Sequence, residues 1–448
     1  MIAKNAEILV VGGGGVMGSS TALHLARRGY TNVRIMDMFQ LPSANSAGND
    51  MNKASFCLMY GKQLKPSQLI STQYVDGIWG RLAFETWGAW SDDQLFSPYL
   101  HGTGRVDLAS ADNPTRLASL RKQYERSREI GRADNVEWLD SREAILKRAP
   151  YLSHGLIEGW SGLWIRDAGW MAARDALKAI GDELERLGVN SVYGTSGTFD
   201  SLLLGPDGRT VTGVRAANGT EWKADLVVIA AGAWSPVLVD LEGQCESKCW
   251  QFGHIQLSPE ETANLKNMPA MYNNGLGFFF EPSTEGVMKI VNEFEGYTRL
   301  SSCKPFGSNS EVTMSVPRSH AIHTTDTIPD EGLKAIQNVV DTCLPAFKDR
   351  EIFDTALCWC TDSIDGNWLI CEHPRYDGLT VATGDSGHTF KMLPIVGSYV
   401  VDCIEGTLSS EDKGLWRWRP EVKRGVPYGR DVITPKDLSQ VEGWRHDA

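Results

Sequence analysis

Residues 7–39, EILVVGGGGVMGSSTALHLARRGYTNVRIMDMF, place four consecutive glycines between an apolar run and a segment with helical spacing. The run AEILVV (6–11) has the length and β-branched content of a buried strand. Apolar residues at helical spacing follow over 16–29, and NVRIMDMF (32–39) predicts a second buried strand. The stretch therefore predicts a strand–helix–strand unit, whose crossover is almost always right-handed.

The glycines of this stretch fit a phosphate-binding turn. Gly13, Gly15 and Gly18 satisfy G-x-G-x-x-G directly after the strand and before the helix. The first glycine permits the tight turn, the second lets a pyrophosphate approach the backbone, and the third lets helix and strand pack closely. Asp37 follows Gly18 by 19 residues, where a carboxylate can accept hydrogen bonds from ribose hydroxyls. Because strand, spacing, helix and acid agree, the pattern favours a bound dinucleotide over a plain glycine-rich turn.

Length and composition limit the class of protein. A chain of 448 residues is too long for one compact core, so two domains are expected. A net charge of −12 argues against nucleic acid or an anionic membrane surface as a partner, and no run of 18 apolar residues predicts a membrane span. Nine scattered cysteines favour a reducing compartment. We therefore expect a cytoplasmic protein, and its last residues, His-Asp-Ala, do not match the peroxisomal tripeptide.

Further strand and glycine signals lie far along the chain. Residues 167–189 predict a long amphipathic helix, and 191–234 predict short strands separated by PDG and NGT turns, ending in the buried strand DLVVIAAGAW. From 250 to 320 the pattern is mixed strand and loop, including GHIQLS, GFFFEP and GVMKIV. Residues 379–406 then predict a strand, a glycine loop and a helix. The nucleotide-binding segments are thus expected in several separate pieces.

This separation bears on which dinucleotide binds. An NAD enzyme usually completes its nucleotide site within one contiguous domain, whereas here AAGAW (230–234) and ATGDSGH (382–388) add loops from elsewhere. Such pieces favour FAD, which is long and buried along its whole length. We therefore predict an α/β protein with a discontinuous, Rossmann-like FAD-binding domain and an inserted α+β substrate domain built on an antiparallel sheet. The predicted boundaries are 1–90, 159–236 and 356–448 for the FAD-binding domain, and 91–158 and 237–355 for the substrate domain.

Two cysteines are candidates for chemistry. Cys358 and Cys360, in CWC, are expected on one face of a strand, since residues i and i+2 point the same way. No second cysteine or histidine pair lies at zinc spacing, so a metal site is not predicted. Two interpretations remain, a pair of core cysteines or a thiolate that adds to an activated flavin methyl carbon.

Two lysines and a histidine are further candidates. Lys289, in GVMKIV, is either a lysine with a buried stem whose ammonium reaches water, or a cation that stabilises the negative charge formed when oxygen accepts electrons. Lys391 follows a glycine-rich loop and is placed to bind a substrate carboxylate. His388, in the same loop, either packs through a hydrogen bond or contacts the substrate.

Several longer motifs resemble one family. PSANSAGNDMNK, SVPRSHAIHTTDTIPD, CWCTDSIDGNWLICEHP, ATGDSGHTFKMLP and WRWRP are together similar to the fungal fructosyl amino acid and fructosyl peptide oxidases, or amadoriases, which are relatives of monomeric sarcosine oxidase. The similarity runs from about residue 5 to 445, and CWCTD with SGHxFK is its most specific part. The resemblance implies FAD attached covalently through an 8α-S-cysteinyl bond.

The resemblance also assigns roles to single residues. It places the flavin link on Cys358 and so favours the second interpretation of the CWC pair, and it places oxygen activation on Lys289. Lys391 matches a lysine that binds the substrate carboxylate, Glu293 a substrate-binding glutamate, and Lys53 a basic residue near the isoalloxazine ring. Arg430 and His388 complete the expected substrate-binding set. The residues expected to contact FAD are Gly13, Gly15, Val16, Met17, Gly18, Asp37, Lys53, Ala231, Gly232, Cys358, Gly387 and Lys391.

Two departures from the family concern the substrate. The family often has CDE where this chain has VNE, so Asn292 replaces an acidic residue beside the matched glutamate. Residues 54–80 also differ strongly from fructosyl peptide oxidases, in a segment expected to shape the pocket entrance. These departures leave the oxidase chemistry better supported than the sugar-amine substrate.

The predicted activity is oxidation of a secondary amine by oxygen. The preferred substrate is a fructosyl amino acid or fructosyl dipeptide, which would give glucosone, the free amino acid or peptide and hydrogen peroxide. The alternative is the same oxidation of an N-methyl amino acid, a saccharopine-type opine or an intermediate of a fungal secondary pathway. A flavin-dependent dehydrogenase that passes electrons to a partner protein would have no need for Lys289. We expect a monomer whose partners are a small-molecule substrate and oxygen.

Overall fold

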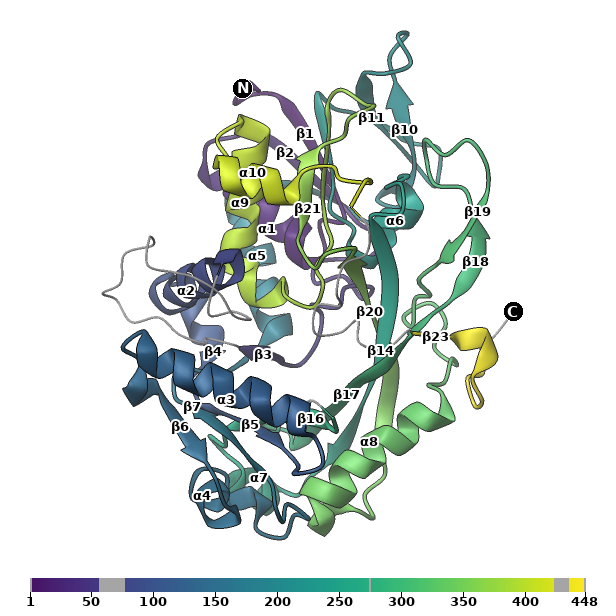
Figure 1. The fold of residues 1–448 in the computed structure, drawn as a ribbon. Helices are drawn as coiled ribbons and strands as arrows, with labels where there is room; N and C mark the ends of the chain where they lie inside the picture. The colour runs from purple at the N-terminus through teal and green to yellow at the C-terminus, as the bar shows by residue number, and fades with distance from the viewer. Residues whose placement is uncertain (1, 56–76, 274, 423–434, 447–448) are drawn as a thin grey trace.

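The computed structural model describes residues 2–55, 77–273, 275–422 and 435–446. Two large sheets dominate this part of the chain, one in the upper and one in the lower half of Figure 1. Among the described residues the first sheet has six strands, in the order β21 (Leu369–Glu372), β22 (Leu379–Thr383), β13 (Leu226–Ile229), β1 (Glu7–Val11), β2 (Asn32–Met36) and β9 (Asn190–Val192). All neighbours in it are parallel except β21 and β22.

The first sheet is covered on both faces. Successive side chains of β1 point to opposite faces, so Ile8 and Val10 pack among the helices α1 (Val16–Arg27), α5 (Ala173–Arg186) and α9 (Leu393–Glu405). Leu9 and Val11 pack on the other face, against the small antiparallel sheet of β10 (Phe199–Leu204), β11 (Val211–Ala216) and β12 (Glu221–Lys223). The predicted strand–helix–strand unit and the α/β class are confirmed.

The second sheet is mostly antiparallel. In the part of the chain that the structure describes it has nine strands. Eight follow the order β20 (Phe353–Ser363), β14 (Cys245–Gln256), β17 (Val287–Thr298), β16 (Gly277–Phe279), β15 (Ala270–Asn273), β5 (Arg105–Ala109), β7 (Ser161–Ile165) and β6 (Val136–Leu139), and β23 (Lys436–Asp437) pairs with β17.

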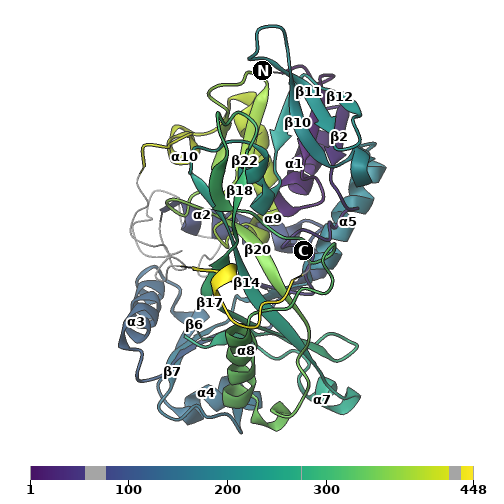
Figure 2. The same cartoon turned by 90° about the vertical axis from the view of Figure 1, so that its right-hand side faces the viewer.

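Two strands of the second sheet, β14 and β17, are much longer than the sequence suggests. The strands β14 and β17 have 12 residues each and β20 has 11, whereas apolar runs predict only 253–258 and 286–291. They extend from the lower half of the molecule toward the first sheet, as both views show (Figures 1 and 2). Residues at the two ends of one strand therefore lie in different surroundings.

Helices cover the second sheet unequally. Ile290, Phe279 and Met271 pack with Ile336 of α8 (Asp330–Cys343) on one face. The other face is turned toward α3 (Pro114–Glu129), whose Tyr124 packs on β6 and β7. The remaining helices are α2 (Gly77–Asp92), α4 (Arg142–Arg148), α6 (Ser235–Leu238), α7 (Pro259–Asn264) and α10 (Ser410–Trp416). Of the helices described, none has the length and apolar character needed to cross a membrane.

One predicted helix is shorter than expected. Residues 167–189 contain α5 only from Ala173 to Arg186, and β8 (Gly169–Met171) precedes it. β8 pairs with β3 (Lys53–Ser55) and β4 (Leu100–His101), and its Trp170 stacks on His101 at 3.8 Å between ring centroids. Tertiary pairing therefore overrides the helical pattern at this end. A further hairpin consists of β18 (Leu300–Cys303) and β19 (Val312–Ser315).

Candidate active site

A cavity of about 1100 Å³ extends from the glycine turn of the first sheet to the inner face of the second sheet. It is lined by residues of β1 and β2, by residues 230–234 directly after β13, by the loop before α9, and by β14, β17, β20 and α3. Most of the site residues expected from the sequence line this cavity: Gly15, Val16, Met17, Asp37, Lys53, Ala231, Gly232, Lys289, Cys358, Gly387, His388 and Lys391. The fold thus brings together segments that are hundreds of residues apart.

The glycine turn shows how each glycine is used. Gly12 has a φ of +84°, and a Cβ on it would lie 2.5 Å from the Cα of Ala231. The tight turn therefore depends on Gly12, and the prediction that Gly13 makes this turn is wrong. A Cβ on Gly13 would lie 2.3 Å from the Cβ of Ile35, so Gly13 allows the turn to pack closely against β2. A Cβ on Gly18 would lie 2.3 Å from the Gly12 carbonyl oxygen, which fits the packing role predicted for it.

Gly15 is different, because its missing side chain leaves space at the cavity. A Cβ there would come no closer than 3.5 Å to another atom, the Gly12 carbonyl oxygen, and Gly15 lines the cavity. It also precedes the first residue of α1, where backbone N–H groups and the helix dipole attract a phosphate. The turn thus offers the cradle that a dinucleotide pyrophosphate requires.

Asp37 lies at the end of β2, beside this turn. Its carboxylate accepts hydrogen bonds from the Gly14 N–H at 3.1 Å and from the Ser43 hydroxyl at 2.7 Å. Burial raises the pKa of Asp37, and these hydrogen bonds partly offset that effect. Asp37 lines the cavity, so the carboxylate is held in place where a ribose would lie.

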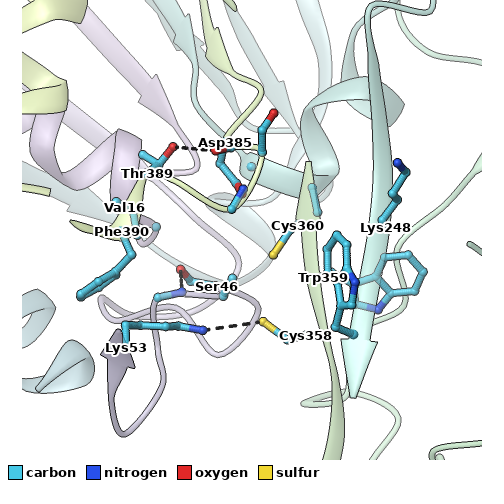
Figure 3. Close-up of a pocket in the computed structure, with 18 of the residues that line it drawn as sticks. Val16, Ser46, Lys53, Lys248, Cys358, Trp359, Cys360, Asp385, Thr389 and Phe390 are labelled. Atoms are coloured by element: carbon cyan, nitrogen blue, oxygen red, sulfur yellow. Dashed lines mark hydrogen bonds between the residues drawn. The ribbon is translucent and has the colours of Figure 1, made fainter. Parts of the chain in front are cut away.

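The CWC pair lies on β20 with both thiols toward the cavity. Figure 3 shows Cys358 and Cys360 on one side of the strand and Trp359 on the other, as the strand period requires. The interpretation as two core cysteines is therefore wrong. A hydrogen bond from Cys360, with the nearby charge of Lys53, lowers the pKa of the Cys358 thiol to about 6, although burial opposes the shift.

Lys53 is the cation nearest to Cys358 in Figure 3. Its Nζ lies 4.0 Å from Cys358 Sγ, in hydrogen-bond geometry for sulfur. A thiol that loses its proton near neutral pH is a nucleophile, and an adjacent ammonium stabilises the thiolate. The arrangement therefore fits a cysteine that forms a covalent bond with a bound group.

A buried carboxylate joins the two lysines of the site. Asp50 accepts from Lys289 Nζ and lies 2.8 Å from Lys53 Nζ. Burial raises the pKa of the Asp50 carboxyl, but the two lysines outweigh burial and hold that pKa well below its ordinary value. Burial lowers the pKa of Lys289, whereas Asp50 opposes this effect and also raises the pKa of Lys53 above its ordinary value. The ring of Phe252 lies 4.7 Å from Lys289 Nζ.

Asp50 is the residue that sequence reasoning missed. It stands three positions before Lys53, within PSANSAGNDMNK, where the resemblance assigns a role to the lysine and none to the aspartate. Its second partner is 239 residues away along the chain, so no local pattern predicts the bridge. A buried lysine without a local partner was the one available signal, since such a group is seldom stable unpaired.

The loop before α9 supplies the remaining residues. Lys391 is buried in a short helical turn, Phe390–Met392, and its carbonyl accepts from the Thr86 hydroxyl and the Trp90 indole N–H, both at 2.7 Å. The ring of His388 lies 4.6 Å from that of Trp79. These contacts with α2 fix the backbone of the loop at the cavity wall.

Some expected residues are not placed. Arg430, and residues 56–76 of the segment 54–80, lie outside the described residues, as does the side chain of Glu293. Asn292 is described: its amide donates to the Leu276 carbonyl at 2.7 Å and accepts from Gln251 at 3.1 Å. Two neutral groups, the Leu276 carbonyl and the Gln251 amide, thus hold Asn292.

Comparison with known proteins decides the family. A family described as FAD dependent oxidoreductase matches residues 7–403. The chain belongs to this family. As an FAD dependent oxidoreductase it needs a long dinucleotide site, and the Gly15 cradle, Asp37 and the continuous cavity fit that cofactor. FAD is therefore its cofactor.

Similar proteins narrow the chemistry of this FAD dependent oxidoreductase. A fructosyl peptide oxidase from E. terrenum is 43% identical, with a TM-score of 0.91, over 100% of this chain and 99% of that chain. A fructosamine oxidase from Aspergillus fumigatus, amadoriase II, is 33% identical, with a TM-score of 0.83, over 99% and 98%. The L-saccharopine oxidase of Schizosaccharomyces pombe is 30% identical over 97% of this chain and 98% of its own length. The chain is thus an FAD-dependent oxidase of secondary amines.

Proposed function

We propose that this oxidase cleaves the C–N bond of fructosyl amino acids or fructosyl dipeptides. Oxygen and water are consumed, and glucosone, the free amino acid or peptide and hydrogen peroxide are formed. The observation that carries the proposal is the Lys53–Asp50–Lys289 cluster beside Cys358. The similarity to fructosyl peptide oxidases over the whole chain supports the sugar amine as the substrate.

The residues that hold the cofactor follow from the cavity wall. Gly15 and the start of α1 would hold the pyrophosphate, Asp37 would hold a ribose, and Cys358 would hold the flavin through its sulfur. Lys53 stabilises the Cys358 thiolate while the link forms. Bound FAD would supply the two-electron oxidation of the C–N bond and the transfer of these electrons to oxygen.

The chain's own groups bind the substrate and stabilise charge. Lys391 binds the carboxylate next to the amine of a fructosyl amino acid, or the peptide carbonyl that takes its place in a fructosyl dipeptide. The amine enters as the neutral base, so no dedicated strong base is required. Positioning supplies much of the rate, because a fixed orientation removes the entropy cost of bringing the reactants together. Lys289 provides a positive charge where oxygen becomes negative, and Asp50 keeps that lysine charged inside a buried site.

A second candidate substrate is a saccharopine-type opine. It undergoes the same oxidation of a secondary amine, and the relation to L-saccharopine oxidase over nearly the whole chain favours it specifically. The two substrates differ in the group on nitrogen, which is a deoxyketose in one case and a dicarboxylic acid in the other.

An oxygen electrode tests these assignments. Purified enzyme is given fructosyl-valine, fructosyl-lysine, fructosyl-valyl-histidine, saccharopine and an N-methyl amino acid, and oxygen uptake and peroxide are measured. Peroxide from the fructosyl compounds is expected. Peroxide from saccharopine alone would transfer the function to the second candidate, and no peroxide from any fructosyl compound would refute the proposal. Lys289→Met serves as the control for electron transfer to oxygen.

A further inference from the structure

The floor of the cavity is a row of residues that crosses the second sheet. Phe252 of β14 pairs with Val291 of β17, Val291 with Phe278 of β16, Phe278 with Tyr272 of β15, and Tyr272 with Asp107 of β5. All five line the cavity. Because paired residues of neighbouring strands share a face, this row forms one continuous surface.

The two ends of the row differ in chemistry. At the β17 end, Lys289 lies two positions before Val291 and so on the same face, above Phe252. In the middle, Phe278 and Tyr272 stack at 5.3 Å between ring centroids. At the β5 end, the row finishes at Asp107, whose carboxylate is 1% exposed. An apolar floor thus leads from the oxidation site to a buried charge.

Two arginines share this one carboxylate. Arg105, also 1% exposed, donates from Nε to Asp107, and its guanidinium lies 4.3 Å from the ring centroid of Tyr272. Arg116 of α3 reaches the same cavity, but its nearest nitrogen is 3.9 Å from Asp107, beyond hydrogen-bond length. Its side chain is 14% exposed, and its buried Nε has no hydrogen-bond partner among the described residues.

The cluster therefore has two guanidinium groups beside one carboxylate, and only Arg105 is within hydrogen-bond distance of it. Burial lowers the pKa of Arg105, and the charge of Asp107 opposes that effect. Arg116 makes no hydrogen bond to a counter-ion among the described residues, and this is unfavourable for a cation that is mostly shielded from water. An anion that enters the cavity would supply that partner. The planar guanidinium of Arg116 can bind a carboxylate through two parallel hydrogen bonds.

We propose that Arg116, supported by Arg105 and Asp107, binds a substrate carboxylate that lies far from the oxidised C–N bond. This deepens the proposed function and rests on it. The favoured substrate is a secondary amine with a remote carboxylate, of which a fructosyl dipeptide is the sugar-amine example. In fructosyl-valine the carboxylate lies next to the reacting nitrogen, so this substrate brings no carboxylate to Arg116.

The spacing agrees with a tail of this length. Three strand-to-strand steps separate β17 from β5, or about 14 Å at roughly 4.8 Å per step. Part of this span holds the reacting group itself. A tail of two or three residues covers about 7–11 Å when extended, so a dipeptide brings its terminal carboxylate near the cluster.

The test compares two substrates that differ only in this carboxylate. Steady-state kinetics are measured for fructosyl-valyl-histidine and for its C-terminal amide, with the wild type, Arg116→Gln and Arg116→Lys. A hydrogen-bonded charge pair corresponds to a preference for the acid of about tenfold or more in kcat/KM. This preference, the ratio of kcat/KM for the acid to kcat/KM for the amide, is expected to arise mainly from KM. The ratio should fall to about one in Arg116→Gln and be intermediate in Arg116→Lys.

Arg121→Gln is the matched control, because Arg121 is on the same helix but faces Glu125 and Trp138. It should keep the preference of the wild type. A wild type that does not distinguish acid from amide would overturn the inference, as would an unchanged preference in both Arg116 variants.

Equilibrium binding separates this inference from the proposed function. Valyl-histidine and valyl-histidine amide are titrated into the holoenzyme in a calorimeter, which requires no turnover. Tighter binding of the acid that is lost in Arg116→Gln supports the carboxylate site even if no fructosyl compound is oxidised. Equal binding of both peptides to the wild type counts against the site even if fructosyl compounds are oxidised.

Discussion

Replacing Asp50 with asparagine removes the carboxylate between Lys53 and Lys289 while keeping the side chain's size. At 2.8 Å from Lys53 Nζ, the carboxylate attracts that ammonium by about 6 kcal/mol at an effective dielectric constant of about 20. Desolvation offsets part of this attraction, and breaking a buried ion pair costs about 3–5 kcal/mol of stability. Asp50→Asn should therefore lower the melting temperature and also change the charge of Lys289.

The direction of the pH effect follows from the charges. Burial already lowers the pKa of Lys289, and Lys53 lowers it further, so without Asp50 that pKa falls again. Lys289 then loses its proton as the pH rises through the lowered pKa, and its stabilisation of negative charge on oxygen is lost. Loss of one such group slows a reaction about 10²–10³-fold. Reoxidation of the reduced flavin should slow by this amount at alkaline pH and recover as the pH falls.

Stopped-flow absorbance separates the two half-reactions. Flavin reduction is followed with substrate in the absence of oxygen, and reoxidation is followed after mixing the reduced enzyme with oxygen, each across the neutral to alkaline range. Lys289→Met should reoxidise slowly at every pH, because it has no proton to regain. The reasoning is refuted if Asp50→Asn slows both half-reactions equally, or if its slow reoxidation does not depend on pH.

Two further predictions concern the cofactor. Gly15→Ala should weaken FAD binding with little change in the free energy of unfolding, because the added methyl group points into the open cavity. Gly18→Ala should instead destabilise the fold by about 1–3 kcal/mol, because its methyl group clashes with the Gly12 carbonyl. If the two variants had equal effects on FAD affinity and on melting temperature, this prediction would be contradicted. Cys358→Ser should release the yellow colour into the supernatant when the protein is denatured. Cys360→Ala should keep the bond but form it more slowly, because the Cys358 thiol loses the hydrogen bond that lowers its pKa. Intact mass measured over the time of reconstitution with FAD checks both variants, and a Cys358→Ser protein that still carries covalent flavin would exclude Cys358 as the tether.

The sequence predicts the parts of the fold where the pattern is local. The strand and helix of residues 7–39 appear within a few residues of their expected bounds, because glycine spacing and apolar periodicity act over short distances. The lengths of β14 and β17 are not predicted, because each strand passes from one environment to another and its apolar period changes along the way. Tertiary pairing likewise decides the strand β8 within a segment that has the pattern of a helix.

The candidate site was predictable in its chemistry but not in its electrostatics. Cysteine, lysine and glycine motifs indicated which groups face the cavity, and their placement in one cavity agrees with that. Asp50 and the Arg105–Asp107–Arg116 cluster depend on strand register and on contacts between distant segments. The pattern of a single sequence does not show which distant residues pair. It also predicted that Gly13 makes the tight turn, whereas Gly12 adopts that conformation.

The cross-strand row on the second sheet has a consequence for how such enzymes diverge. Lys289 lies on β17 and Cys358 on β20, whereas Tyr272, Asp107 and α3 are reached only after further strands have been crossed. A mutation at the far end alters what is held there and leaves the oxidising end in its register. Substitutions at the far end can therefore change which amine is preferred while the oxidation site keeps its geometry.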